Sequence, residues 1–156
     1  MKREVKSDEI RLEGQTAVWD MLETAEVEGT YQGEFKFRTA LNPLQEITAD
    51  REYRDLMGSN EAQAPTRIKN LAYALTQLKY RVLEAPHFWV DGSHLPGSQV
   101  KDIEIIELVF QAAMLSETKY KALIAERQLE AIEKLKASRL QQQAKAKDEN
   151  ELKSLG

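Results

Sequence analysis

Two histidines and an aspartate that lie close together are the first candidates for a metal site. His87 and His94 are seven residues apart, and Asp91 lies between them. Imidazole and carboxylate groups bind zinc, but this spacing does not match that of a known zinc motif. We interpret both histidines as ordinary loop residues and predict no metal site.

Pairs of carboxylates are the second candidates, because general acid–base catalysis uses such pairs. Glu104 and Glu107 are spaced to share one helix face, and so are Glu46 and Asp50. The chain contains 26 acidic residues, so pairs of this kind are expected by chance. A catalytic pair also needs burial and separated pKa values. We interpret these pairs as solvated helix faces, which leaves an acid-dependent hydrolase as the weakest hypothesis.

Other catalytic and cofactor motifs are missing from the sequence. The segment 29–33 holds two glycines but matches neither the phosphate-loop pattern nor the dinucleotide-binding pattern. No Gly-x-Ser-x-Gly nucleophile elbow occurs. The chain has no cysteine, which excludes disulfides, thiolate metal sites and cysteine nucleophiles. We predict a protein that is not an enzyme and needs no cofactor.

Aromatic and aliphatic side chains supply the candidates for protein binding, since aromatic residues are frequent anchors at interfaces. The predicted partner-binding residues are Phe35, Phe37, His87, Phe88, Trp89, Leu129, Ile132, Leu135 and Leu140. For the aromatic loop, a role in covering the core of its own domain is an equal alternative. For Phe35 and Phe37 we expect an apolar side in the core, while the backbone edge of their strand accepts another strand.

A basic run near the carboxyl end is the candidate for nucleic-acid binding. It consists of Lys134, Lys136, Arg139, Lys145 and Lys147, with acidic residues before and after it. The formal net charge of the chain is -4, which does not favour a phosphate backbone as partner. We expect a solvated helix face here and keep a nucleic-acid-binding adaptor as the alternative function.

The hydrophobic pattern predicts the elements that must position these residues. We expect a charged, loosely held leader over 1–13 and a short amphipathic helix over 16–25. Strict alternation over 27–41 predicts a half-buried strand, with a hairpin around Gln32 and Gly33.

A capped helix follows the strand. Asn42 and Gln45 have the spacing of a capping box, and Pro43 fits the first helical position. Gly58 supplies the left-handed residue that ends the helix.

The rest of the chain is predicted to be helical. Apolar stripes predict helices over 66–84 and 102–115, separated by a surface loop over 87–97. Residues 117–155 are dominated by strong helix formers and carry only a thin apolar edge.

Together these elements predict a mainly α protein with a small β-hairpin (α+β), a helical body and an extended carboxy-terminal helix. We divide it into a charged leader over 1–13, a helical domain over 14–116 and an extended helix with a polar tail over 117–156. No run approaches 18 apolar residues, and residues 1–10 are too charged for a signal peptide, so we predict no contact with a membrane.

Several stretches of the chain resemble small morphogenesis proteins of tailed bacteriophages, most closely the tail assembly chaperone group. They are residues 29–43 (GTYQGEFKFRTALNP), 50–58 (DREYRDLMG), 71–78 (LAYALTQL) and 86–89 (PHFW). The resemblance is one of layout and covers residues 27–120: a strand, a capped polar helix and a helical body. The long helix over 117–156 departs from the compact form of that group, so a head, neck or tail component of the virion is an equally open reading.

The resemblance implies a bacteriophage structural or assembly protein without catalytic residues. We expect it to bind other phage structural proteins or copies of itself stoichiometrically, in the virion or in the host cytoplasm. The predicted contacts are the 35–37 strand, the 87–90 loop and the apolar edge over 129–140.

Overall fold

The computed structural model describes residues 3–155 and separates the chain into two compact units, Met1–Tyr120 and Lys121–Gly156. We name them unit 1 and unit 2. Unit 1 holds the sheet and most of the helices, and unit 2 consists of the residues of α3 (Ile103–Leu155) from Lys121 onward. Met1 and Lys2 of the predicted leader and Gly156 of the predicted tail lie outside the described residues.

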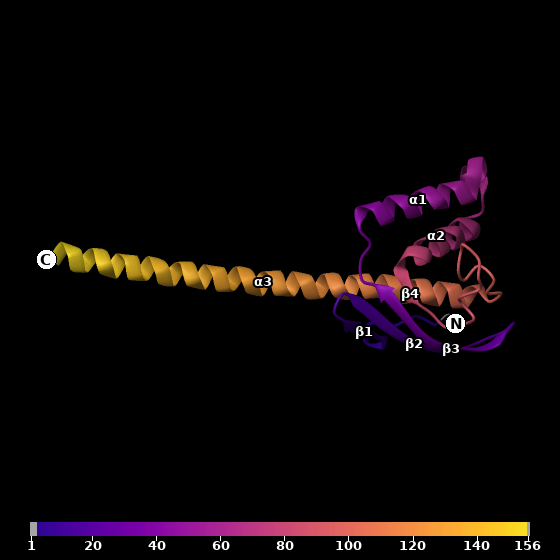
Figure 1. The fold of residues 1–156 in the computed structure, drawn as a ribbon, viewed down its shortest axis with the longest axis horizontal. Helices are drawn as coiled ribbons and strands as arrows, with labels where there is room; N and C mark the ends of the chain where they lie inside the picture. The colour runs from indigo at the N-terminus through magenta and orange to yellow at the C-terminus, as the bar shows by residue number, and fades with distance from the viewer. Residues whose placement is uncertain (1–2, 156) are drawn as a thin grey trace. The chain divides into compact units, whose positions relative to one another are not determined.

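Unit 1 contains a four-stranded antiparallel sheet in the order β1-β2-β3-β4 (Figure 1). The strands are β1 (Ile10–Glu13), β2 (Thr16–Ala25), β3 (Gly29–Arg38) and β4 (Val82–Glu84). β2 and β3 pair along their whole length, from Thr16 opposite Arg38 to Ala25 opposite Gly29. The predicted fold class, a mainly α protein with one small β-hairpin, is therefore wrong, because the chain forms a four-stranded sheet. The hairpin predicted around Gln32 and Gly33 is wrong too: both residues lie inside β3, and the chain turns between Ala25 and Gly29.

The segment 16–25, predicted as a helix, forms β2. Its apolar residues fit a helical stripe, but they also alternate, and Ala17, Trp19 and Met21 are all buried. A helix of this length is marginal by itself, whereas the strand gains neighbours on both sides. One neighbour is β1, which lies in the predicted leader and pairs Ile10 with Trp19.

The described helices are α1 (Pro43–Met57), α2 (Thr66–Arg81) and α3, with 3-10 turns η1 (Ser7–Glu9) and η2 (Gly58–Gln63). The predicted capping box is confirmed: the Gln45 N–H donates to Asn42 at 2.8 Å, and the Asn42 N–H donates to Gln45 at 3.0 Å. Gly58, with φ +66°, ends α1 as predicted.

The later helix boundaries differ from the predicted ones. α2 ends three residues early, because Val82–Glu84 pairs with β3 as β4. The break predicted near residue 116 is absent: the Ser116 hydroxyl donates to the Ala112 carbonyl at 2.7 Å, a bond that fits inside a helix.

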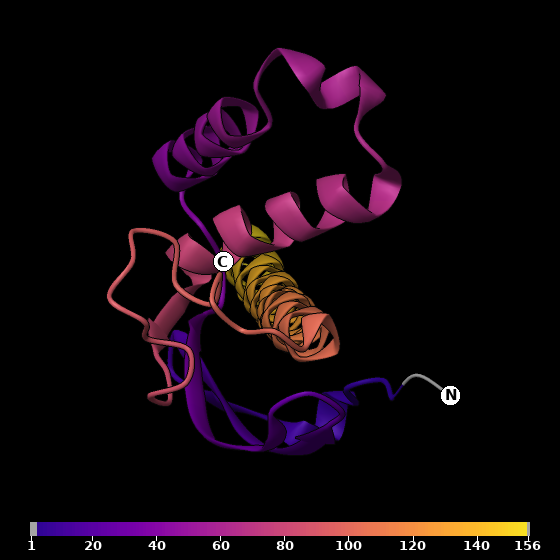
Figure 2. The same cartoon turned by 90° about the vertical axis from the view of Figure 1, so that its right-hand side faces the viewer.

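The core of unit 1 lies between one face of the sheet and the helices α2 and α3. Trp19, Phe35 and Phe37 fill it from the sheet, and Leu78 of α2 and Val109 of α3 meet them. Figures 1 and 2 show the first turns of α3 between the sheet and α2, with α1 stacked on α2. α1 is thus the layer of unit 1 farthest from the sheet.

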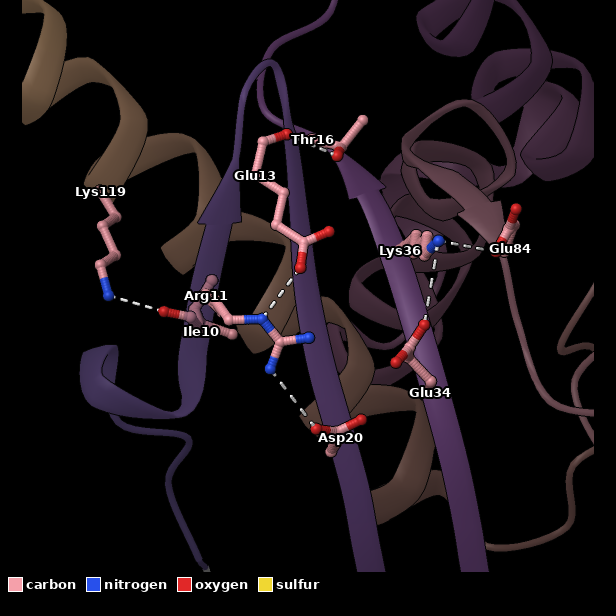
Figure 3. A network of polar contacts seen from close by, with 9 residues as sticks. All are labelled: Ile10, Arg11, Glu13, Thr16, Asp20, Glu34, Lys36, Glu84 and Lys119. Atoms are coloured by element: carbon pink, nitrogen blue, oxygen red, sulfur yellow. Dashed lines mark hydrogen bonds and ion pairs between the residues drawn. The ribbon is translucent and has the colours of Figure 1, made fainter.

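The other face of the sheet is covered by charged side chains (Figure 3). Arg11 and Lys36 are cross-strand neighbours of Val18, which is buried although it lies on this face. Arg11 reaches Glu13 at 3.0 Å, and Lys36 reaches Glu84 at 3.4 Å. The aliphatic stems of the two cations cover Val18 while their charged ends stay in water.

A lysine from α3 lies at the outer edge of β1, on the side away from β2. The Lys119 ammonium donates to the Ile10 carbonyl at 2.6 Å (Figure 3). It also donates to the Ser7 carbonyl at 3.1 Å. A charged group at this position disfavours the addition of a further strand.

Candidate protein-binding surfaces

The aromatic residues predicted to bind a partner form the core of unit 1. Phe35, Phe37 and Trp89 are all at most 1% exposed. The Phe35 ring lies 5.6 Å from that of Trp89, 5.8 Å from that of Phe37 and 6.0 Å from that of Phe88. Of the two roles open for the aromatic loop, the structure supports the cover of the core for Trp89, which is buried. Phe88 is half-buried, and His87 is exposed.

Two glycines allow this loop to close over the sheet. A Cβ atom on Gly33 of β3 would lie 2.4 Å from the Pro86 ring, and one on Gly97 would lie 2.5 Å from the Trp89 ring. The Gly97 N–H also donates to the Trp89 carbonyl at 3.0 Å. The loop is therefore packed against the domain, and Val90, which is 58% exposed, is its apolar residue facing water.

Asp91, the carboxylate between the two histidines, is used inside the loop. It accepts hydrogen bonds from the Ser93 hydroxyl at 2.6 Å and the Ser93 N–H at 3.0 Å. The hydroxyl bond is the main reason that the pKa of Asp91 lies below its ordinary value. Residues 3–155 contain no group of three or more metal-ligating side chains placed to share an ion.

The paired carboxylates are divided among different contacts. Asp50 forms an ion pair with Arg54 at 3.0 Å on the exposed side of α1. Glu104 and Glu107 both line a small hollow of about 180 Å³ beside Arg3 and Glu23, where Arg3 lies 2.7 Å from Glu23. Asp50 is thus held in a surface ion pair, whereas Glu104 and Glu107 line a hollow that also contains the partly buried ion pair of Arg3 and Glu23.

The backbone edge of β3 is not open along its length. β2 covers one side of the strand, and β4 pairs with Lys36 and Phe37 on the other. At Gly33, the Pro86 ring lies where a Cβ atom would stand, so it covers a face of the strand and not its hydrogen-bonding edge. β4 thus takes the predicted edge at Phe37, whereas in residues 3–155 its pairing does not extend to Phe35.

α1 presents exposed aliphatic side chains that the sequence analysis did not select. Leu44 and Ile47 are 72% and 56% exposed, and Ala49 is the buried residue of the helix. α1 is held to α2 by Glu52, which accepts from Lys79 at 3.0 Å and from the Tyr80 hydroxyl at 2.6 Å. Burial raises the pKa of Glu52, but these two donors outweigh it and hold the pKa below its ordinary value.

A groove of about 620 Å³ lies between α2 and the part of α3 in unit 1. Its apolar lining includes Leu71, Tyr73, Ile106 and Phe110, and Arg67 also lines it. The rings of Tyr73 and Phe110 are in contact at 6.0 Å. The shape and lining suit an apolar side chain or a helix face from a partner.

Unit 2 carries a further set of exposed aliphatic residues. Leu129, Ile132, Leu135 and Leu140 are between 49% and 66% exposed, and the side chains of residues 125–154 are all exposed. These four are the predicted partner-binding residues that the structure leaves accessible, together with His87. The apolar spacing that predicted them is found in α1 as well, where Leu44 and Ile47 are also exposed.

Comparisons with known proteins give no relative: no protein-family model, no curated protein and no solved structure matches the chain. Among the described residues, no helix has the length and apolar character needed to cross a membrane.

Proposed function

We propose that the protein is a non-enzymatic bacteriophage structural or assembly protein that acts by stoichiometric protein–protein binding. The layout of residues 27–120, which resembles the tail assembly chaperone group, supports the phage assignment. The exposed aliphatic residues of α1 and unit 2 support the binding role.

The exposed helix of unit 2 is the observation that carries this proposal. Most of the stability of a protein helix comes from packing an apolar face, and exposed apolar patches mark interaction sites. Residues 125–154 have no side chain buried in the structure, yet they present a row of aliphatic residues. A partner that covers this row would supply the missing packing.

Mass spectrometry of purified phage particles and affinity capture from infected cells test the proposal together. We expect a tagged chain to be recovered with identified phage structural proteins in a fixed molar ratio. Presence in the mature particle identifies a virion component, and presence only in infected cells identifies an assembly chaperone. Absence from both, with no phage protein captured, would contradict the proposal.

A nucleic-acid-binding adaptor is the second candidate function. The observation that favours it is the run from Lys134 to Lys147, which holds five cations and no acidic residue. Binding to phosphates releases counterions, so the affinity must fall steeply as salt is added. Filter binding at low and moderate salt tests this, and an affinity that does not depend on salt eliminates it.

A further inference from the structure

Two neighbouring rows of exposed side chains run along unit 2. Residues three and four apart in a helix lie above one another, so alternating steps of three and four define a row. Row A consists of Glu126, Leu129, Glu133, Lys136, Leu140 and Gln143. Row B consists of Ala125, Gln128, Ile132, Leu135, Arg139 and Gln142.

The aliphatic residues in these rows are placed symmetrically along the helix. In row A, Leu129 and Leu140 are equally far from the point between residues 134 and 135. In row B, Ile132 and Leu135 are equally far from the point between residues 133 and 134. When two such helices lie antiparallel around a two-fold axis near residue 134, Leu129 meets Leu140 of the second copy and Ile132 meets Leu135 of the second copy.

The charges in the rows favour the same arrangement. The acidic residues Glu126 and Glu133 precede the centre, and the basic residues Lys136 and Arg139 follow it. In the antiparallel register, Glu133 faces Lys136 of the second copy. In a parallel pair the acidic half would face an acidic half, and like charges would repel.

We infer that unit 2 binds a second copy of itself as an antiparallel helix pair centred near residue 134. The inference rests on the proposed function, because it names the partner of the same exposed helix. A C2 pair buries one surface twice, so all eight exposed aliphatic residues of the two rows are covered at once. Only four aliphatic residues per copy take part, so the interface is small and we expect a dissociation constant of roughly 1 μM or higher.

Cysteine pairing in the full chain tests the orientation, because the natural chain contains no cysteine. Ala125 and Gln142 of row B face each other across the proposed pair. Neither of them is among the four aliphatic residues that form its contacts. Under mild oxidation we expect A125C mixed with Q142C to form a disulfide-linked dimer. Neither variant alone should do so, because identical positions lie about 25 Å apart along the antiparallel pair.

A charge swap tests the interface itself. E133K places lysine opposite Lys136, and K136E places glutamate opposite Glu133, so each variant alone should dimerise roughly tenfold more weakly in sedimentation equilibrium. A mixture of the two restores both ion pairs and should recover the wild-type affinity. E130K is the matched control: it changes the charge equally, but Glu130 lies off both rows.

Three results would overturn the inference. They are a monomer at all concentrations, disulfides formed by the single cysteine variants but not by the mixture, and an E130K effect equal to that of E133K. Circular dichroism on each variant excludes loss of helix as the cause. If dimerisation fails while phage proteins are still captured, the proposed function stands and this inference fails. If the chain dimerises but captures no phage protein, this inference stands and the proposed function fails.

Discussion

At the scale of residues, single side chains of unit 1 connect parts that are far apart in sequence. Asp102, which directly precedes α3, accepts from the N–H groups of Val27 at 2.9 Å and Glu28 at 3.0 Å, and from the Tyr31 hydroxyl at 2.7 Å. An aspartate in this place ordinarily caps its own helix. Here it satisfies two backbone donors of the β2–β3 turn and fixes that turn to the start of α3.

The protonation of Asp102 should therefore affect stability in acid. Burial raises its pKa, but the hydrogen bonds from Tyr31, Val27 and Glu28 outweigh burial and hold the pKa below 3.8, its ordinary value. A carboxyl group of this kind contributes stability above its unfolded pKa and loses it as the pH falls through the folded pKa. We expect the wild-type Tm to decrease as the pH is lowered below 3.8, partly for this reason. We also expect D102N to have a Tm several degrees lower than the wild type at neutral pH.

Thermal unfolding followed by circular dichroism measures both effects. D102N has no group to titrate at this position, so its Tm should depend less on pH in the acid range. An acid dependence equal to that of the wild type would show that Asp102 does not act as described.

Gly97 should tolerate substitution less well than a nearby glycine. Both Gly97 and Gly92 have positive φ, +88° and +77°, but only at Gly97 would a Cβ atom strike Trp89. We expect G97A to lower the free energy of unfolding by about 1–3 kcal/mol more than G92A, which carries the backbone cost alone. Urea unfolding measures the difference, and equal losses would contradict the contact.

At the scale of elements, the sequence predicted what depends on local signals. The cap at Asn42 and the stop at Gly58 are local, and both are confirmed. β2 could not be predicted with certainty from its own residues, because 16–25 fits two periodicities and the deciding partner, β3, lies elsewhere in the chain. β4 is only three residues long and follows a helix with no turn signal between them.

α1 has a single buried residue, Ala49, so the hydrogen bonds of Glu52 form a large part of its attachment to α2, beside the ring contact of Tyr53 with Tyr73. We expect E52A, which removes the bonds to Lys79 and Tyr80, to speed hydrogen exchange of the α1 amides about tenfold through local opening. The amides of β3 should be unchanged, because they belong to the core. Native-state exchange with mass spectrometry measures both.

Glu46→Ala provides the comparison on the same helix. Glu46 is exposed, so its replacement should change exchange in α1 far less than E52A does. If both variants accelerate exchange equally, Glu52 does not hold α1 to α2.

At the scale of the whole molecule, the candidate surfaces could be predicted only in part. Spacing identifies an apolar side of an element but not what covers that side. Phe35 and Trp89 cover each other in unit 1, whereas Leu129 and Leu140 have the same apolar character and stay exposed in unit 2. The difference depends on packing between distant segments, which only the folded structure supplies.

The two units should therefore respond differently to protein concentration. A single helix in water is marginal, so the amides of unit 2 should exchange quickly in dilute solution and become protected as the chain passes through its dimerisation range. Unit 1 folds around its own core, so the amides of β2 and β3 should not change. Hydrogen exchange at two concentrations, one well below and one well above the dissociation constant, measures this in a single sample series.

E133K should delay the protection of residues 125–143 to a concentration roughly tenfold higher. Protection that is the same at both concentrations would mean that the helix of unit 2 is stabilised without a second copy.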